Sequence, residues 1–152
     1  CFINPEAHEF IAPGNMPQRI KDFCQRTGQM VPESVGQVVR CIYESLALKY
    51  RSAFDSLKDC TGKAYNTIHL VGGGAKDRLL CQMTANSCKT KVVAGPIEAT
   101  ALGNIAVQLL ATKEIADINE VRRIIGNNEE IKTYTPENIC SWEEAYKRFL
   151  LY

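Results

Sequence analysis

The sequence predicts an α/β fold built on parallel strands. Two short β-rich runs, 67–71 and 91–94, are each followed by a segment whose apolar residues have helical spacing. The order strand–helix–strand–helix with tight connections is that of a βαβ unit, in which neighbouring strands run parallel. Two strands cannot form a stable sheet by themselves. We therefore expect an incomplete parallel sheet with flanking helices. Its other strands would come from residues outside this chain, from a second copy, or from strands that the pattern does not reveal.

The composition is that of an ordinary globular domain. The chain has 152 residues, of which 45% are hydrophobic and 23% charged, and this length favours one domain. Lys and Arg number 18 against 17 Asp and Glu, so the charge gives no reason to expect nucleic acid or an acidic membrane as partner. No apolar run is long enough to span a bilayer, and no basic-then-apolar leader opens the chain. These features favour the cytoplasm.

The segment 1–16 is expected to be irregular, because Asn-Pro and Pro-Gly-Asn turn signals recur in it. Pro17 is well placed as the first residue of a short helix, which Gly28 ends. The apolar residues of the opening segment have no local partner, which suggests a cut inside a larger protein. These residues are Phe2, Ile3, Phe10 and Ile11.

A long helix is expected next. Pro32 is expected to open it with Ser34 near its start, and Gly62 is expected to stop it after about Asp59. At about 1.5 Å per residue this helix is roughly 40 Å long, which is typical of a helix that lies across a sheet. Its apolar stripe consists of Val35, Val38, Val39, Ile42, Leu46, Ala53, Phe54 and Leu57.

The second half of the chain alternates strands and helices. Helices are expected over 77–85, 97–111, 117–125 and 141–151, and an extended segment over 134–136. The first of these helices is expected to turn three apolar side chains inward, namely Leu79, Leu80 and Met83.

Seven cysteines are present, none of them in a CxxC pair. An odd count in a chain of this length favours a reducing compartment and mostly buried thiols. Cys81 and Cys88 are seven apart and histidines are few, so the spacing does not indicate a zinc site. Cys24 and Cys41 flank the turn at 28–32 between two predicted helices. We expect them to meet across the helix seam, and the spacing leaves open whether they are bonded.

The most informative segment is the glycine triplet Gly72-Gly73-Gly74, between a predicted strand and a predicted helix. Glycine is needed where φ is positive or where a ligand approaches the backbone closely. At the carboxyl end of a parallel strand, that ligand would lie over the sheet edge, beside the N–H groups of the next helix. Lys76 and Asp77 complete neither a P-loop nor a dinucleotide fingerprint. A tight turn that needs glycine only for its geometry is the alternative.

The remaining polar residues do not form a catalytic set. Gly103 lies within the helix predicted over 97–111, where it costs about 1 kcal/mol relative to alanine, and close packing of another backbone is expected to offset that cost. Glu98 suits the first turn of this helix, and capping is the favoured role. His69 is expected to be packed or at a strand edge, and His8 exposed. No nucleophile–base pair or paired carboxylates are readable, so this chain alone does not look like a complete active site.

Two segments together resemble the carboxyl-terminal half of the FGGY carbohydrate kinases. They are 68–74, which ends in the glycine triplet, and 92–104, which contains Gly-Pro-x-Glu-Ala-x-Ala-Leu-Gly-Asn. Stretches within 2–34 and Ser45-Leu46-Ala47-Leu48 resemble the rhamnulokinase branch of this family. The resemblance covers roughly residues 2–136.

The resemblance implies an actin/hexokinase-like (ribonuclease H-like) ATPase fold of two domains that close over a cleft. Residues 1–152 would then be the C-terminal part of the second domain, without its first strands and without the first domain. The implied reaction transfers the γ-phosphoryl group of ATP to L-rhamnulose with Mg²⁺, an Asp accepting the sugar hydroxyl proton. That Asp lies upstream of the matched region, so the fragment is expected to be inactive alone. Its implied partners are ATP or ADP, L-rhamnulose and the missing N-terminal domain.

By the same resemblance, Gly73 matches the family's nucleotide-contacting glycine, and Gly72 and Gly74 shape the turn. Asp77 matches a position where family members often carry Asn near the adenine, and an Asp there could accept a hydrogen bond from the exocyclic amine.

The other positions that match the family are expected to have structural roles. Glu98 and Gly103 match the helix after the adenosine motif, near the hinge, and Cys24 and Cys41 match a cysteine pair seen in the rhamnulokinase branch. Two alternatives stay open: a non-enzymatic module of the same half-fold, used for oligomer contacts or nucleotide sensing, and an unrelated βαβ binding domain. Self-association through an uncovered sheet edge or apolar face is also open.

Overall fold

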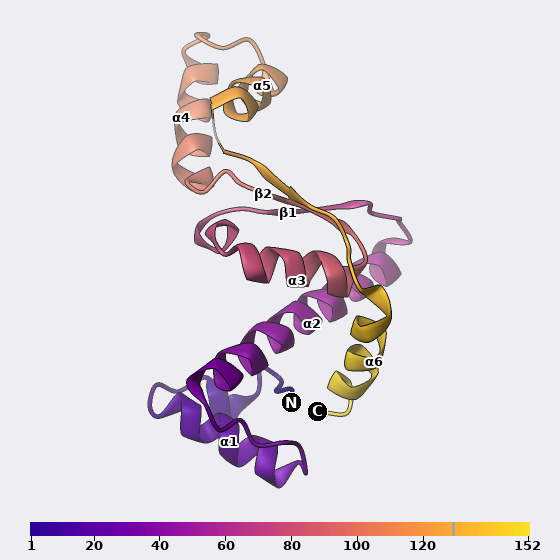
Figure 1. Cartoon of the computed structure of the whole chain (residues 1–152). Coiled ribbons are helices and arrows are strands. Elements are labelled where there is room, and N and C mark those ends of the chain that lie inside the picture. The colour runs from indigo at the N-terminus through magenta and orange to yellow at the C-terminus, as the bar shows by residue number, and fades with distance from the viewer. Residues whose placement is uncertain (129) are drawn as a thin grey trace.

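The computed structural model describes residues 1–128 and 130–152. The molecule is elongated, with a small sheet near its middle, α1 at one end, and α4 and α5 at the other (Figure 1). In chain order the elements are η1 His8–Phe10, α1 Met16–Arg26, α2 Val35–Thr61, β1 Thr67–Leu70, η2 Gly73–Lys76, α3 Arg78–Cys88, β2 Lys91–Ala94, α4 Ala99–Ala111, α5 Ile118–Asn128, β3 Lys132–Tyr134 and α6 Ile139–Phe149.

The sheet is mixed, with strand order β1-β2-β3. β1 and β2 pair in parallel with Ile68 opposite Val92, and β2 pairs antiparallel with β3, which places Tyr134 opposite Val92. The predicted βαβ unit is confirmed. The parallel pair is extended by β3, an antiparallel strand that the sequence pattern did not reveal. It has only three residues, too few for a two-residue alternation to stand out.

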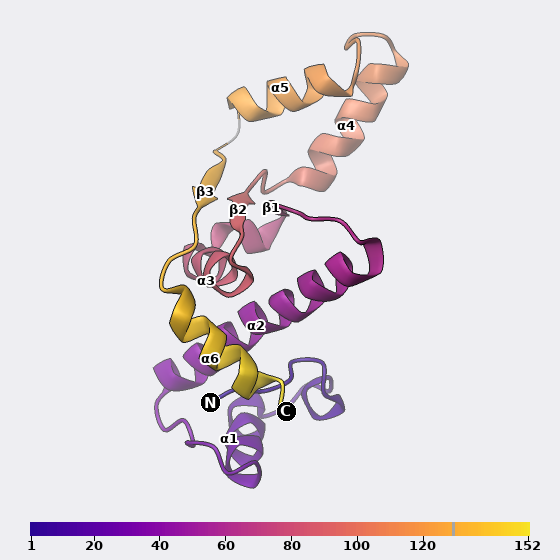
Figure 2. The same ribbon diagram turned by 90° about the vertical axis from the view of Figure 1, so that its right-hand side faces the viewer.

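Three of the helices, α2, α3 and α6, form layers on one side of the sheet. α3 packs on β2, α2 packs on α3, and α6 lies against both helices (Figures 1 and 2). The predicted length of α2 is confirmed, since 27 residues at about 1.5 Å each extend roughly 40 Å. α3 lies between α2 and β2, whereas the later part of α2, with Phe54 and Leu57, lines one cavity together with Ile68 of β1.

The first turn of α2 is fixed by a capping box. Ser34 is the N-cap: its Oγ accepts the Gln37 N–H at 3.2 Å, and Gln37 Oε1 accepts the Ser34 N–H at 3.1 Å. Pro32 therefore does not open the helix, as the sequence suggested, but lies buried in the loop before it. Gly62 ends the helix at a φ of 64°, as predicted.

Part of the predicted apolar stripe of α2 is uncovered. Val38 and Phe54 are buried, whereas Val35 is 81% exposed and Leu57 46% exposed. Leu79 on α3 was expected to point inward and is also mostly exposed, while Met83 is buried as predicted. Apolar spacing identifies a helix face suited to burial, and this chain supplies a covering for only some of that face.

The opening segment does have partners within this chain. Gln29 holds the backbone of Phe2 from both sides, accepting its N–H at 2.7 Å and donating to its carbonyl at 2.8 Å. Ile3 is buried, and Phe10 packs edge-on against the ring of Phe23. These partners are distant in sequence, in keeping with the expected lack of local ones, and Ile11 stays exposed.

Most of the buried apolar side chains among the described residues form three clusters. The first joins the opening segment, α2, α3 and α6; the second joins the opening segment, α1 and α2; the third lies under the sheet. They consist respectively of Phe2, Ala47, Leu48, Met83, Trp142 and Phe149; of Ile3, Ile20, Phe23, Cys24, Val38 and Cys41; and of Ala75, Cys81, Ala85, Val92 and Ala94.

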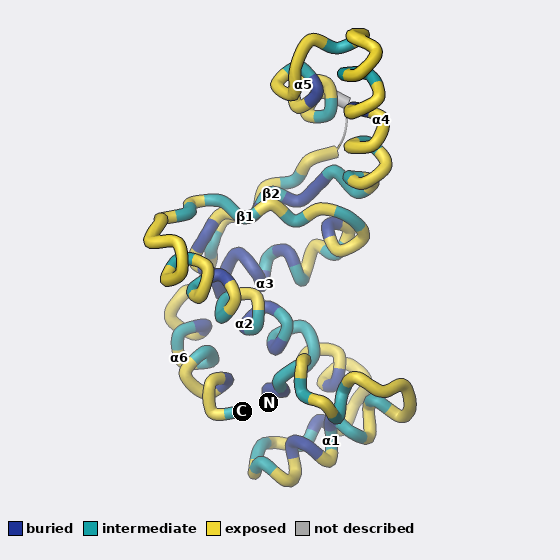
Figure 3. Tube along the Cα trace, turned by 180° about the vertical axis from the view of Figure 1, so that it is seen from behind, coloured by how far each residue is buried: buried dark blue, intermediate teal, exposed yellow. Residues whose placement is uncertain are grey.

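α4 and α5 pack against each other away from the sheet, and α4 is largely exposed (Figures 2 and 3). A Cβ at Gly103 would meet no atom within 4 Å, so the expected close approach of another backbone does not occur in this chain. Glu98 precedes α4 as its N-cap residue but makes no side-chain capping bond, so the predicted capping contact is wrong. Ile105 and Val107 are exposed, and self-association through this face stays a prediction. No helix among the described residues is both long and apolar enough to cross a bilayer.

Glu143 on α6 lies between two cations that tie the last helix to the layers beneath. Its Oε1 is 2.6 Å from Arg51 Nη1 and 2.6 Å from Lys89 Nζ. These ion pairs, chiefly that with Arg51, lower the pKa of Glu143 to about 2. A carboxyl whose folded pKa is depressed stabilises the fold above its unfolded pKa and loses this effect as the pH falls toward the folded value.

We expect Glu143→Gln to lower Tm at neutral pH, and the difference from wild type to shrink as the pH falls from 4.5 toward about 2. Thermal unfolding of both proteins across this pH range measures the effect. Glu144→Gln is the matched control, because Glu144 is the exposed neighbour on the same helix. Equal, pH-independent effects of the two variants would contradict a role for the ion pairs.

Candidate functional site

The loops after β1 and β2 are joined at the carboxyl edge of the parallel pair. Gly95 donates its N–H to the Leu70 carbonyl at 2.8 Å, and Gly72 donates to the Pro96 carbonyl at 3.2 Å. The backbone of Gly72 has φ 79° and ψ −163°, a region that is essentially closed to other residues. The fold therefore requires glycine at position 72.

Gly73 and Gly74 have no such requirement. They begin the short η2 helix and are exposed, and a Cβ at either position would meet no atom within 4 Å. Neither residue has a positive φ. A tight turn thus explains the first glycine of the triplet and leaves the other two unexplained. Bare backbone at an accessible edge suits a ligand that lies flat against the main chain.

A polar cavity of about 160 Å³ lies next to this loop. Three cations, Lys76, Arg78 and Lys132, line it together with one carboxylate, Glu130. Glu130 pairs with Lys132 at 2.6 Å, and this contact lowers the pKa of the Glu130 carboxyl. The surplus of positive charge suits an anion such as phosphate. A cavity of this size encloses only part of a cofactor-sized ligand, since whole sites hold about 300–1,000 Å³.

Asp77 has a structural role at the start of α3. One carboxylate oxygen accepts the Leu80 N–H at 3.0 Å and caps α3, and the other accepts a hydrogen bond from the Tyr43 hydroxyl of α2. This pairing lowers the pKa of Asp77 and raises the pKa of Tyr43. An Asp before a helix signals a cap, but no local pattern points to Tyr43. The contact of Asp77 with adenine stays a prediction.

The cysteine pair expected across the α1–α2 seam does meet. The sulfurs of Cys24 and Cys41 lie within 4.8 Å of each other, both thiols are free, and Cys1 joins them. Burial raises the pKa of Cys24 and raises that of Cys41 to about 12. Sequence spacing missed Cys1, because nothing local places it near the seam. His8 is exposed and His69 is an exposed strand residue, as expected.

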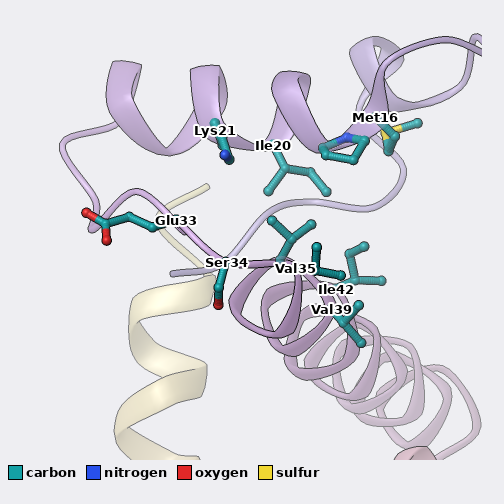
Figure 4. A pocket seen from close by; sticks show the side chains of 10 residues that line it. Met16, Ile20, Lys21, Glu33, Ser34, Val35, Val39 and Ile42 are labelled. Carbon is teal, nitrogen blue, oxygen red and sulfur yellow. The ribbon is translucent and has the colours of Figure 1, made fainter.

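A separate cavity of about 280 Å³ lies between α1 and α2, where Ile20 and Val35 stand on opposite sides (Figure 4). Its lining is mainly apolar, and its polar residues, Lys21, Glu33 and Ser34, do not form an acid–base or nucleophilic set. The glycine loop is therefore the better candidate for chemistry.

A βαβ unit with bare glycines and a basic cavity at its carboxyl edge is typical of nucleotide-binding α/β domains. The chain belongs to the FGGY family of carbohydrate kinases: the model of the family's C-terminal domain matches residues 1–112. This range includes the glycine loop and the whole of α4.

Three curated relatives that match nearly the whole chain are all named rhamnulokinase. The chain is 44% identical to a rhamnulokinase of Bacteroides thetaiotaomicron over 97% of its length, and 41% identical to one of Bacillus subtilis over 91%. It is 40% identical to a rhamnulokinase of Enterobacter sp. over 90% of its length. The chain spans only 30%, 28% and 28% of these three relatives respectively.

A solved structure supports the fold. The xylulose kinase of Rhodospirillum rubrum superposes with a TM-score of 0.60 at 19% identity, over 82% of this chain and 25% of that one. The expected actin/hexokinase-like α/β class is thereby confirmed.

Proposed function

We propose that this chain is the nucleotide-side part of an ATP-dependent carbohydrate kinase. In full length, the protein would transfer the γ-phosphoryl group of ATP to L-rhamnulose and give L-rhamnulose 1-phosphate. The observation that carries the proposal is the pair Gly73 and Gly74, exposed beside a basic cavity with no reason in the fold to be glycine. The choice of sugar is supported by relatives named rhamnulokinase at 40–44% identity.

In this proposal the residues of the chain bind and orient the nucleotide. The backbone at Gly73 and Gly74 would receive the flat purine ring, and the cations around the cavity would attract its phosphates. Gly72 holds the loop in place through its bond to the Pro96 carbonyl. Phosphoryl transfer depends mainly on such positioning and on charge stabilisation, and a bound Mg²⁺ neutralises charge on the phosphates.

The group that accepts the sugar proton and the ligands of Mg²⁺ are proposed to lie outside this chain. Among the described residues, the one group of three potential metal ligands consists of thiols, whereas Mg²⁺ prefers oxygen. Residues 1–152 would form the C-terminal part of the second kinase domain, with further strands and the first domain supplied by the rest of the protein. The place of β1 at the edge of the sheet supports this arrangement.

The 152-residue chain is expected to show no turnover of L-rhamnulose with ATP, whereas the full-length protein is expected to phosphorylate it. A coupled ADP-release assay on both proteins, with L-xylulose as comparison sugar, measures this. Turnover by the short chain would contradict the proposal that the proton-accepting group and the Mg²⁺ ligands lie outside it. Full-length protein that prefers L-xylulose would overturn the sugar assignment alone, and nucleotide binding without any sugar kinase activity would favour a non-enzymatic module.

A further inference from the structure

A hydrogen bond between distant residues ties the start of α3 to α2. The Tyr43 hydroxyl donates to Asp77 Oδ2, while Asp77 Oδ1 accepts the Leu80 N–H at 3.0 Å. One carboxylate thus caps α3 and also accepts a bond from the neighbouring helix. Tyr43 and Asp77 are both half-buried, so this link lies at the rim of the interface between the two helices.

Asp77 also holds the glycine loop. Its N–H donates to the Gly74 carbonyl at 3.2 Å, and the Ala75 N–H donates to the Gly72 carbonyl at 3.0 Å. Cys81 Sγ lies 3.8 Å from the same Gly74 carbonyl oxygen. The backbone of the loop is therefore fixed from the side of α3, and the position of Asp77 determines where the Gly74 carbonyl is held.

α2 provides a rigid base for Tyr43. Ala47 lies one turn further along the same face of the helix. It is 0% exposed, and its carbonyl accepts a hydrogen bond from Ser87 Oγ of α3 at 2.6 Å. The Tyr43 ring itself packs against the core cluster that contains Ala47. Because the ring is held by this packing, its hydroxyl fixes Asp77 in one orientation.

The charges of the two groups fix the direction of the hydrogen bond. The Tyr43 hydroxyl is the main reason that the pKa of Asp77 is lowered, and the same bond raises the pKa of Tyr43. At neutral pH the carboxylate therefore only accepts and the phenol keeps its proton. Such a charge-assisted bond is stronger than one between neutral groups.

We propose that Tyr43 is a positioning residue for nucleotide binding. Its hydroxyl holds Asp77, and Asp77 holds the glycine loop in the conformation that receives the purine ring at Gly73 and Gly74. This inference rests on the proposed function, because it assigns Tyr43 a role at the same nucleotide site. A loop that is already held in its binding geometry loses less conformational freedom when the ligand binds, so the affinity is higher.

The test measures the Kd for ATP by calorimetry and the KM values of the kinase reaction, all on the full-length protein. Tyr43→Phe removes one oxygen and keeps the ring. We expect it to raise the Kd and the KM for ATP by roughly tenfold, at the lower end of what a hydrogen bond to a charged group contributes, and to leave the KM for the sugar unchanged. A simple loss of folded protein would lower kcat and leave the KM for ATP as it was.

Tyr50→Phe is the matched control. It removes the same atom from the same helix, about two turns further along, at a side chain that lines the apolar cavity between α2 and β1. The Kd for ATP should stay at the wild-type value.

Two variants of Asp77 separate its cap from its link to α2. Asn and Ser are both good N-cap residues, so Asp77→Asn and Asp77→Ser should keep α3 capped. Asn is long enough to bond the Tyr43 hydroxyl, whereas Ser is not, so we expect a smaller rise in the Kd for ATP with Asp77→Asn than with Asp77→Ser. Adding Tyr43→Phe to Asp77→Ser should cause no further loss, because the link is already broken.

An ATP affinity that is unchanged by Tyr43→Phe would overturn the inference and leave the proposed function standing. A further tenfold loss when Tyr43→Phe is added to Asp77→Ser would do the same, since the two residues would then act separately. Full-length protein that binds no ATP would overturn both the inference and the proposed function.

Discussion

Leu48→Ala is expected to lower the free energy of unfolding by about 2–5 kcal/mol, because it leaves a cavity in a packed core. Leu48 is 0% exposed on α2 and lies in the cluster that includes Met83 of α3 and Trp142 of α6. Its side chain is therefore at the junction where three helices are held together. Urea denaturation followed by circular dichroism measures the change.

Leu57→Ala is the matched control. Leu57 lies on the same helix and loses the same atoms, but it is 46% exposed, so the expected cost is below about 1 kcal/mol. Comparable losses for the two variants would contradict the layer order in which α2 meets α3 and α6 through Leu48.

Gly73→Val is expected to abolish adenine-nucleotide binding, or to weaken it by roughly tenfold or more, while the fold is kept. The new side chain would occupy the space proposed for the purine ring, and a tenfold loss corresponds to about 1.4 kcal/mol. The fold is expected to tolerate the change, since a Cβ at Gly73 meets no atom within 4 Å. Nucleotide affinity by calorimetry and Tm, both on the full-length protein, measure the two effects.

Substitutions at two further glycines serve as comparisons for Gly73→Val. Gly126→Val also adds a side chain in open space, but on α5 and away from the loop, and should leave nucleotide affinity unchanged. Gly72→Ala should instead cost about 1–3 kcal/mol of stability, because the φ of Gly72 is 79°. Tight nucleotide binding that survives Gly73→Val would place the nucleotide elsewhere.

Local chemistry made the main elements of the fold predictable. The strands at 67–70 and 91–94 have β-rich sequences, and the helix ends at Ser34 and Gly62 carry residues suited to those positions. The glycine triplet was recognisable because each residue without a side chain demands an explanation. The structure separates the triplet into one glycine that the backbone needs and two that it does not.

What the sequence could not predict depends on contacts between distant residues. β3 is defined by its pairing with β2 and not by its own three residues. The hydrogen bond between Tyr43 and Asp77 joins two helices 34 positions apart, and Cys1 reaches its sulfur partners through the backbone of Phe2. Val35 is a different case. Its apolar side chain predicts burial, but the sequence does not indicate which element would cover it, and in this chain it is exposed.

The central claim is that an adenine nucleotide lies against the backbone after β1. The most direct test is to follow the backbone amide resonances of the chain by NMR during titration with ATP. We predict that the largest shifts occur at Gly73 and Gly74 and extend to Lys76 and Arg78 beside the cavity. Shifts confined to the cavity between α1 and α2, with the glycine loop unchanged, would contradict the account.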